Sequence, residues 1–308
     1  MTMRRADLRI ADEHTMLKRV AVYASFVRFS HSVFALPFAL AGALLAAQRL
    51  QPADPVGWLA GEGVRRLVWI LVAMVAARSA AMGFNRLADA RVDALNPRTA
   101  NRELPRGAMS LREAALFVAT ASVVFVIAAW QLSPLCLALS PVALAIVFWY
   151  SLAKRYTTWT QLFLGLAMAV APVGGWLAAG GRGGWEPWLL ALAIGAWVGG
   201  FDVLYACQDL DFDRAHGLRS IPVRFGVPAS LAISRAMHVV AIACLVALAL
   251  VAPLGRVYLA GVAAVAAMLV YEQSLVRADD LSQVKRAFDL NGYVGILYLV
   301  VLVVSLYA

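Results

Sequence analysis

Long apolar stretches recur along almost the whole chain, and they constrain its fold more than any other feature. Each is close to the roughly 20 residues that a helix needs to cross about 30 Å of hydrocarbon. Hydrophobic residues make up 62% of the 308 residues, whereas a soluble domain is about half apolar. The predicted spans cover residues 20–47, 67–93, 111–131, 134–151, 159–179, 187–210, 229–252, 256–276 and 287–307. The sequence therefore predicts an all-α, multi-pass membrane protein with nine transmembrane helices.

Basic residues alternate between the two sides of these spans. The side that carries the N-terminus holds roughly 19 Lys or Arg, against roughly 5 on the other, and basic loops stay in the cytoplasm. We therefore expect a cytoplasmic N-terminus and a C-terminus outside, in the inner membrane of a bacterial cell. The alternation also accounts for the net charge of +9, so no nucleic-acid partner is expected. The first span is too long and begins too late for a cleaved signal peptide.

No low-complexity run or long linker interrupts the sequence, which predicts one domain over residues 1–308. On the cytoplasmic side, the connections from Leu95 to Leu111 and from Asp213 to Ala229 are long and rich in Arg, Pro and Gly. Loops of that length are usually functional or disordered. Because both follow acidic clusters, we expect them to be functional loops that cap the helices.

Two sets of polar residues at four-residue intervals end the second and sixth predicted spans. They are Asn85, Asp89 and Asp93 and, about 120 residues later, Tyr205, Asp209 and Asp213. Residues i, i+4 and i+8 lie within about 80° around a helix, so each set lines one face. The matched spacing indicates a weak internal repeat whose two halves would face a central cavity. Carboxylates near hydrocarbon are tolerated where they face such a cavity.

Several carboxylates at a membrane boundary repel one another unless a cation neutralises them. Oxygen ligands without His or Cys favour Mg²⁺, which commonly bridges carboxylates to phosphate oxygens. The candidate ligands are Asn85, Asp89, Asp93, Asp209 and Asp213. Asp202 can share a broad face with the second set, whereas Asp211 points elsewhere. The three cysteines are isolated within apolar stretches and predict no metal site.

Basic residues lie directly beyond both acidic sets. They are Arg98, Arg102 and Arg106 after the first, Arg214, Arg219 and Arg224 after the second, and Lys154 and Arg155 at the end of the fourth span. Arg binds phosphate oxygens bidentately, and Lys acts as a point charge. The candidate diphosphate ligands are Arg98, Arg102, Lys154, Arg155 and Arg219. A single basic residue at the end of a membrane span usually only sets the orientation of the protein in the membrane. Together with the two acidic sets, these residues predict a site that holds a diphosphate and stabilises it as it leaves.

At these residues the chain resembles the intramembrane aromatic prenyltransferases of the UbiA superfamily. NRLADARVD matches the family's NxxxDxxxD motif, and DLDFD matches DxxxD with a Tyr one turn earlier. RTANRELPRG, GLRSIPVRFG and YSLAKRYT look like the family's neighbouring segments. The opening VRFSHSVFALPFALAGALLAA is similar to 4-hydroxybenzoate polyprenyltransferases, particularly the branch associated with futalosine-route menaquinone synthesis. Arg86 and Phe212 stand where those enzymes commonly have Asp, but the motif spacing is kept.

The resemblance implies transfer of a polyprenyl group from a polyprenyl diphosphate to a small aromatic acid, in ubiquinone or menaquinone biosynthesis. The implied catalytic residues are Asp89, Asp93, Asp209, Asp213 and Lys154. Loss of the diphosphate would leave an allylic cation. The aromatic ring would attack this cation ortho to a phenolic hydroxyl and then lose a proton.

The acceptor and the donor tail need further contacts. The candidate acceptor ligands are Arg28, His31, Tyr205 and Asp202, with Arg78 and Arg86 as rivals to Arg28. A buried Arg28 would suit an acceptor carboxylate, although a protein carboxylate could equally pair with it. Four small or kinking residues, Gly165, Pro172, Gly174 and Gly175, could either open a lipid-facing groove for the tail or serve ordinary helix packing.

Three other functions fit parts of the pattern. A secondary transporter also has repeats and intramembrane charges, but its site usually lies near the bilayer midplane. A CDP-alcohol phosphotransferase carries a denser DG and AR pattern than this chain. A prenyltransferase for another acceptor, such as a dihydroxynaphthoate, a haem, homogentisate, a lipid glycerol or a sugar phosphate, stays open because a few pocket side chains decide that choice.

Overall fold

The structure is a computed structural model that describes residues 19, 22–23, 25–27, 35–51, 58 and 61–307. Its main helices are α2 (Leu36–Leu50), α3 (Glu62–Leu95), α4 (Leu111–Leu132), α5 (Pro134–Tyr156), α6 (Thr160–Ala178), α7 (Glu186–Ala206), α8 (Leu210–Ala215), α9 (Ile221–Val251), α10 (Gly255–Ser274) and α11 (Val284–Tyr307). A 3₁₀ turn, η3 (Cys207–Asp209), separates α7 from α8. Within the described residues the only β feature is an isolated bridge between Arg277 and Asp280.

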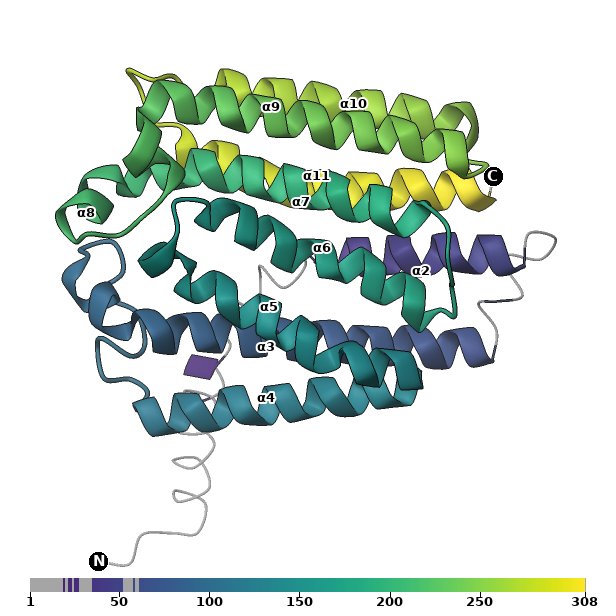
Figure 1. Ribbon diagram of the computed structural model, residues 1–308, viewed down its shortest axis with the longest axis horizontal. Coiled ribbons are helices and arrows are strands. Elements are labelled where there is room, and N and C mark those ends of the chain that lie inside the picture. Colours follow the sequence, from purple (N-terminus) through teal and green to yellow (C-terminus); the bar gives the residue numbers. More distant parts are fainter. Residues whose placement is uncertain are drawn as a thin grey trace, which may run out of the picture.

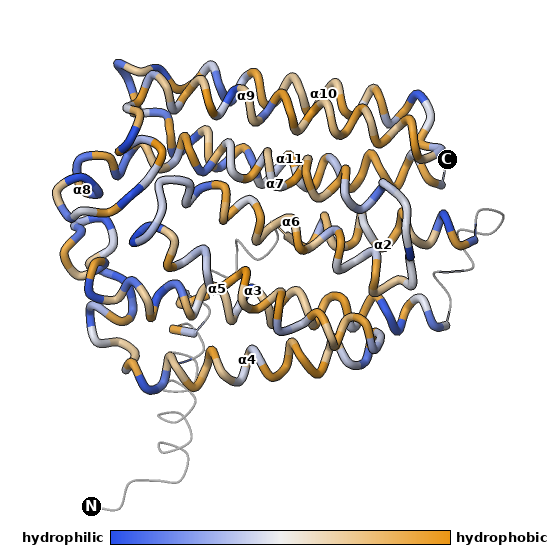
Figure 2. The backbone as a smooth tube through the Cα atoms, viewed as in Figure 1, coloured by the Kyte–Doolittle hydropathy of each residue, from blue (hydrophilic) through white to orange (hydrophobic). Residues whose placement is uncertain are grey.

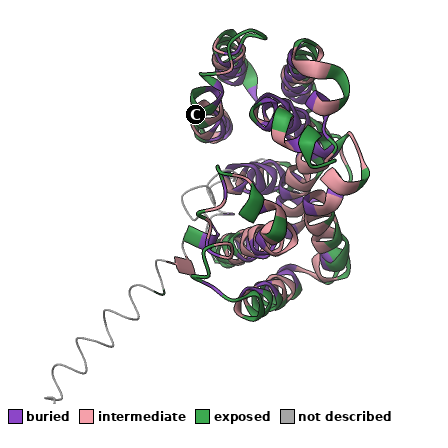
Figure 3. Ribbon diagram, turned by 90° about the vertical axis from the view of Figure 1, so that its left-hand side faces the viewer, coloured by how far each residue is buried: buried purple, intermediate pink, exposed green. Residues whose placement is uncertain are grey.

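The all-α, multi-pass membrane architecture is confirmed. Within the described ranges, eight helices or helical units are long and apolar enough to cross a bilayer, and α2 is a shorter apolar helix of 15 residues. Part of the first predicted span, 20–47, lies outside the described residues, and α2 extends it to Leu50. Large apolar side chains face outward, including Leu250 at 84% exposure and Trp130 at 62%, and Figure 3 shows exposed outer helix faces around a buried interior. Lipid, not water, suits such a surface.

Serine side chains determine where three of the helices begin. Ser110 caps α4, Ser133 caps α5 and Ser220 caps α9, and each hydroxyl accepts a hydrogen bond from the backbone N–H three residues later. Such bonds satisfy donors that a helix start leaves free. Ser133 alone separates α4 from α5 and is followed by a proline at the first helical position, so the two helices are joined by a tight turn.

Successive helices run in opposite directions, as Figure 1 shows. The ends of α3, α5, α7 and α10 therefore meet the starts of α4, α6, α9 and α11 on one side of the molecule. We call this side, with the helix ends that adjoin it, the loop end; its connecting segments are residues 96–110, 157–159, 207–220 and 275–283. In Figure 2 hydrophilic residues gather there beside α8, while the helix bodies are mostly hydrophobic. The loop end thus carries the polar chemistry.

The prediction of a long loop from Asp213 to Ala229 is wrong. Helix α8 extends to Ala215, and α9 begins at Ile221, so the connection between these helices is only residues 216–220. The Gly226 and Pro228 signals belong to a kink within α9, where Gly226 has a φ of 77°. Glycine tolerates that backbone conformation, and the helix resumes beyond it. The loop predicted between Leu95 and Leu111 is confirmed as residues 96–110.

The sixth predicted span is not one regular helix. It ends as α7 at Ala206 and continues through η3 into α8. Asp209 and Asp213 are nevertheless both buried, and Asp211 between them is exposed, as the residue pattern predicts.

Glycines on α6 allow close helix packing rather than a groove. A Cβ added to Gly165 would lie 2.2 Å from the backbone oxygen of Gly195 on α7, and one added to Gly175 would lie 1.9 Å from that of Ala39 on α2. Gly174 has no atom within 4 Å of an added Cβ. Of the two readings of these residues, the structure supports helix packing for Gly165 and Gly175.

We expect Gly165→Ala to lower the melting temperature of the purified protein. Overpacking a tight contact costs about 1–3 kcal/mol, which exceeds the gain of up to about 1 kcal/mol from replacing a helical glycine by alanine. Gly174→Ala is the matched control on the same helix and should leave stability unchanged or raised. Equal shifts in thermal unfolding for the two variants would contradict the packing role.

Candidate active site

The first acidic set lies on the last turns of α3. The Asn85 Nδ2 atom donates to Asp89 Oδ2 at 3.3 Å, as expected for residues four apart on a helix. Asp93 is buried, and its backbone oxygen accepts a hydrogen bond of 3.0 Å from the Thr99 hydroxyl in the following loop. With 34 residues, α3 is about 50 Å long. It is therefore longer than a bilayer is thick, which lets this set lie where lipid gives way to water.

The loop after α3 contacts both acidic sets. Arg102 donates to both carboxylate oxygens of Asp93, at 2.8 and 2.7 Å. Arg98 reaches the second set, where it binds Asp209 bidentately at 2.7 and 3.2 Å. Arg98 also donates to the Tyr205 hydroxyl at 2.9 Å. One loop therefore ties the end of α3 to the segment that follows α7.

Two consecutive residues at the end of α5 also join the two sets. The Lys154 ammonium lies 3.5 Å from Asp213, and the Arg155 guanidinium lies 2.8 Å from Asp89. Arg155 additionally donates to the backbone oxygen of Ala88 at 2.7 Å. Each motif aspartate thus has one cationic partner, and buried carboxylates require such partners. The predicted convergence of the two sets is present.

Arg219 has a different position from the other predicted diphosphate ligands. Its backbone N–H donates to the Lys154 backbone oxygen at 2.8 Å, and its side chain donates to the Tyr156 backbone oxygen at 2.7 Å. It therefore satisfies carbonyls at the C-terminus of α5. The remaining basic residues predicted near the site, Arg106, Arg214 and Arg224, are exposed at the loop end.

The charged and polar neighbours of Arg98, in the loop after α3, shift its pKa. Burial lowers the pKa of Arg98, but the Asp209 carboxylate, Tyr205 and Asp93 outweigh that effect, so the Arg98 pKa lies above its usual value. Arg98 therefore stays charged throughout the physiological range.

Glu103 is a buried residue of this loop that the sequence analysis missed. It accepts a hydrogen bond from the Ser25 hydroxyl. Burial raises the pKa of Glu103, but the Ser25 hydrogen bond, its own backbone N–H and the charge of Arg86 more than offset this, so its pKa lies below the usual range. The only sequence signal was an acidic residue within the basic segment RTANRELPRG.

Deeper polar residues extend the site toward the helix bodies. Asp202 on α7 interacts electrostatically with Lys154. Tyr150 on α5, to which the sequence analysis assigned no role, interacts with Arg78, Asp89 and Asp202. The family-like segment YSLAKRYT begins at this tyrosine and could have identified it. These side chains lie between the acidic sets and the apolar interior.

The predicted acceptor ligands divide into two groups. Tyr205 and Asp202 belong to the site, and the Tyr205 ring also packs against Phe288 with a centroid distance of 4.7 Å. Arg28 and His31 lie outside the described residues.

The donor set matches a hard cation in its chemistry, since the acidic sets offer carboxylate and amide oxygens. In the arrangement that the described residues adopt, no group of three or more His, Cys, Asp or Glu side chains is assembled tightly enough to hold a metal ion. The carboxylates instead bind Arg and Lys.

Comparison with known proteins assigns the site to a family. The model of the UbiA prenyltransferase family matches residues 35–300. The chain belongs to this family. The resemblance expected from the two acidic motifs is confirmed, and the protein is a membrane-embedded prenyltransferase.

Individual UbiA relatives support this assignment. The chain is 36% identical over 242 residues to a 4-hydroxybenzoate octaprenyltransferase from Alkalilimnicola ehrlichii, covering 77% of this chain and 82% of that protein. The apo structure of a UbiA homologue from Aeropyrum pernix is 36% identical, has a TM-score of 0.79 and covers 89% of this chain and 98% of its own. A UbiA homologue from Archaeoglobus fulgidus, solved with GPP and Mg²⁺, shares the fold at 19% identity, with a TM-score of 0.67 and coverage of 93% and 100%.

We expect Glu103→Gln to destabilise the protein by about 1 kcal/mol at pH 7, because it removes a charged hydrogen-bond partner from a buried position. The pKa of Glu103 is lowered by folding, so its contribution is present above the unfolded pKa of about 4.3 and is lost as pH falls through the folded pKa. The difference in melting temperature from the unsubstituted protein should therefore vanish in strongly acidic buffer. Glu62→Gln is the control, because Glu62 lies at the opposite end of α3 from the site and its ion pair with Arg65 is exposed. Exposed ion pairs contribute little to stability. A pH-independent difference would contradict this role.

Proposed function

We propose that this protein transfers a polyprenyl group from a polyprenyl diphosphate to 4-hydroxybenzoate or a closely similar aromatic acid, in quinone biosynthesis. The observation that carries the proposal is the placement of Lys154 and Arg155, consecutive residues whose side chains reach different acidic sets. A diphosphate placed between the sets would lie beside both cations. The name of the Alkalilimnicola relative supports the choice of acceptor.

Mg²⁺ is the cofactor that we propose for the site. Asn85, Asp89 and Asp93 would hold it from α3, and Asp209 and Asp213 from the opposite side. When bound, Mg²⁺ would neutralise diphosphate charge and favour departure of the leaving group. The Archaeoglobus homologue, solved with Mg²⁺ and GPP, is consistent with this proposal.

The cations of the site would bind the diphosphate. Arg98, Arg102, Lys154 and Arg155 already lie against the acidic sets, so each could turn from a carboxylate to a phosphate oxygen. Arg219, which was also predicted to bind diphosphate, would act indirectly by holding the end of α5 where Lys154 and Arg155 lie. The bond between the prenyl C1 atom and the diphosphate oxygen would break, and the diphosphate would retain the electron pair.

The acceptor would lie beneath the diphosphate, toward the helix bodies. Its ring would form a carbon–carbon bond with C1 of the prenyl group ortho to the phenolic hydroxyl and would then lose the ring proton. Asp202 and Tyr205 are the described residues that we propose to contact it, with Arg28 and His31 binding its carboxylate end. Arg78, through its interaction with Tyr150, is a second candidate for the carboxylate.

We propose that the loop end faces the cytoplasm of a bacterial cell. The basic residues that predict this orientation include the four cations paired with the acidic sets. A water-soluble diphosphate product would then be released into the cytoplasm. A dihydroxynaphthoate is the alternative acceptor, since it presents a similar phenol and carboxylate. The transporter reading lacks support, because the aspartates gather at the loop end rather than midway along the helices.

We expect Asp89→Asn and Asp209→Asn each to reduce turnover by at least about 100-fold, because each removes a charge that would hold the metal and the diphosphate. Asp211→Asn is the matched control, since Asp211 lies within the second motif but is exposed. Purified protein would be incubated with Mg²⁺ and geranyl diphosphate, and 4-hydroxybenzoate and a dihydroxynaphthoate would be offered in separate reactions. The mass of the prenylated product then identifies both reaction and acceptor. Full activity of both charge-removing variants would refute the proposed metal roles.

We expect Arg28→Ala to raise the acceptor KM by about tenfold or more while changing the donor KM little, because a lost contact to a carboxylate costs about 1.5–3 kcal/mol. Steady-state kinetics with each substrate varied in turn provide the test. Equal effects on both KM values would remove Arg28 from the acceptor site.

A further inference from the structure

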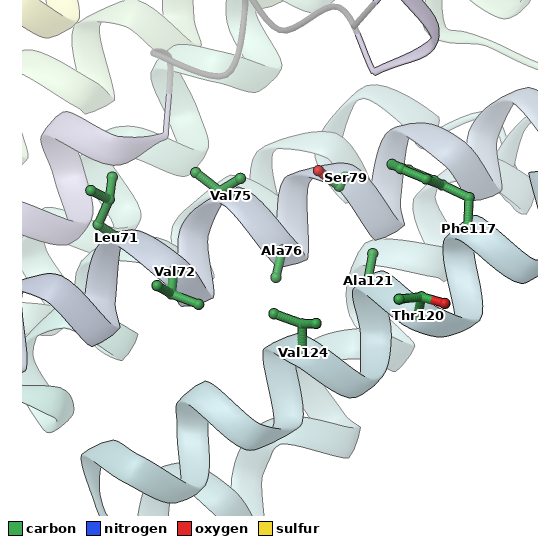
Figure 4. A pocket seen from close by; sticks show the side chains of 9 residues that line it. All are labelled: Leu71, Val72, Val75, Ala76, Ser79, Phe117, Thr120, Ala121 and Val124. Carbon is green, nitrogen blue, oxygen red and sulfur yellow. The ribbon is translucent and has the colours of Figure 1, made fainter. Parts of the chain in front are cut away.

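Two surfaces outside the candidate active site are suited to lipid contact. The first is a groove of about 370 Å³ between α3 and α4, and Figure 4 shows side chains of both helices around it. The described residues that line it are apolar except for the hydroxyls of Ser79 and Thr120, and none of them is charged. This groove can therefore contact the hydrocarbon of the bilayer, but it has no group that would bind a charged lipid headgroup.

The second surface lies at the loop end, where the end of α5 meets the start of α9. The Arg219 side chain donates to the Tyr156 backbone oxygen at 2.7 Å, and the rings of Trp159 and Phe225 pack with a centroid distance of 5.8 Å. Arg224, the fourth residue of α9, precedes Phe225 and is exposed. We call Tyr156, Trp159, Arg219, Arg224 and Phe225 the basic-aromatic patch. Arg219 and Tyr156 are 63 residues apart in the sequence, so the patch exists only in the folded protein.

The patch lies at the depth of the lipid headgroups. Helix α5 has 23 residues and is about 34 Å long, close to the roughly 30 Å of hydrocarbon that it crosses. Its last residue, Tyr156, therefore lies at the boundary between hydrocarbon and water. Tyr156, Trp159 and Phe225 keep 60%, 46% and 43% of their surfaces exposed. Exposed aromatic rings, above all those of Trp and Tyr, concentrate at this boundary in membrane proteins.

The patch carries positive charge that no carboxylate neutralises. The ion pairs of the loop end use other cations, and within the described residues neither Arg219 nor Arg224 forms one. The two segments of the patch also have no acidic neighbours in the sequence, because no Asp or Glu occurs at residues 114–185 or 214–271. Two exposed guanidinium groups beside aromatic rings at the bilayer surface fit a phosphate that is attached to hydrocarbon.

The arginine side chains, and not the backbone, are the donors available to such a phosphate. At the start of α9, the Ile221 N–H donates to the Gln161 side-chain oxygen at 3.2 Å. The Val223 N–H donates to the Ser220 hydroxyl at 3.4 Å, and Pro222 has no N–H. The N-terminus of α9 is therefore already satisfied, and the exposed guanidinium groups remain for an anion.

We propose that the basic-aromatic patch binds an anionic phospholipid of the leaflet at the loop end. The lipid phosphate would accept hydrogen bonds from Arg224 and from the Arg219 N–H groups that do not bind Tyr156, since a guanidinium has five. The glycerol and the upper acyl chains would pack against the rings of Trp159 and Phe225. A headgroup with net negative charge fits better than a zwitterionic one, which brings its own cation. In the proposed orientation this leaflet is the cytoplasmic one, whose anionic lipids attract basic segments.

A lipid bound to the patch would also act on the end of α5. Arg219 donates through its backbone N–H to the Lys154 backbone oxygen at 2.8 Å and through its side chain to that of Tyr156. Lys154 and the adjacent Arg155 contact the two acidic sets. A phospholipid that fixes Arg219 would therefore help to hold these two cations in place. The binding itself does not depend on the proposed reaction, so it is measured without substrate.

The test is lipid binding by the purified full-length protein in detergent, measured by native mass spectrometry. Phosphatidylglycerol and phosphatidylcholine with the same acyl chains are the probes. We expect phosphatidylglycerol to bind more tightly, and Arg224→Gln to weaken its binding about fivefold, because one basic residue near a membrane surface contributes about that factor. Phosphatidylcholine binding should not change. Arg106→Gln is the matched control, since Arg106 is also an exposed loop-end arginine but belongs to the loop after α3, and it should leave the affinity for both lipids unchanged.

Melting temperatures provide a second measurement. A ligand that binds only the folded protein stabilises it, so phosphatidylglycerol should raise the melting temperature of the unsubstituted protein more than that of Arg224→Gln. Equal binding of the two lipids by the unsubstituted protein, or equal losses in the Arg224 and Arg106 variants, would overturn the proposal.

Two competitors distinguish the phospholipid from other sources of phosphate. Displacement of phosphatidylglycerol by an equimolar amount of inorganic phosphate would indicate a site for a free anion. Displacement by an equimolar amount of geranylgeranyl diphosphate would assign the patch to the prenyl donor. Either result would refute a phospholipid site, whereas retention of phosphatidylglycerol against both competitors would support it.

Discussion

Neutralisation of carboxylates at the edge of the bilayer is the interaction on which the rest of the site depends. Asp93, Asp209 and Asp213 are buried, and a buried charge without a partner would be strongly destabilising. Their partners come from the loop after α3 and from the end of α5. Since those ion pairs connect segments far apart in the sequence, the same charges that form the site also hold the loop end together.

The pairing of each carboxylate with a cation complements the charges of the proposed substrate. The charges of the acidic sets are close to balanced, because each motif aspartate pairs with an Arg or a Lys. A magnesium diphosphate carries both signs of charge, so its metal could replace the cations at the carboxylates while its phosphate oxygens receive those cations. Binding would then exchange ion pairs rather than create isolated charges. The hydrocarbon tail would extend away from these polar groups, along the apolar helix bodies.

The sequence predicted which charged residues lie together better than it predicted the local geometry of the backbone. Four-residue spacing revealed Asp89 and Asp93 because helical periodicity is a local property. The early start of α9 was missed, since glycine and proline give the same signal for a loop as for a kink. The break after Ala206 was also missed, because no glycine or proline between residues 207 and 213 marks it. Close packing of Gly165 on Gly195 could not be predicted, because it depends on a helix 30 residues later in the chain. Glu103 was missed because its partner Ser25 lies 78 residues away.

The sequence distances within the ion pairs have a consequence for how the protein is made. Arg102 follows Asp93 by nine residues, so this pair can form while the ribosome is still completing the connection between α3 and α4. Arg155, the partner of Asp89, is synthesised 66 residues after it. Asp209, the partner of Arg98, is synthesised 111 residues after it. During membrane insertion, α3 therefore carries a carboxylate whose counter-ion has not yet been synthesised. Water and lipid headgroups at that helix end would solvate the Asp89 carboxylate until α5 is inserted.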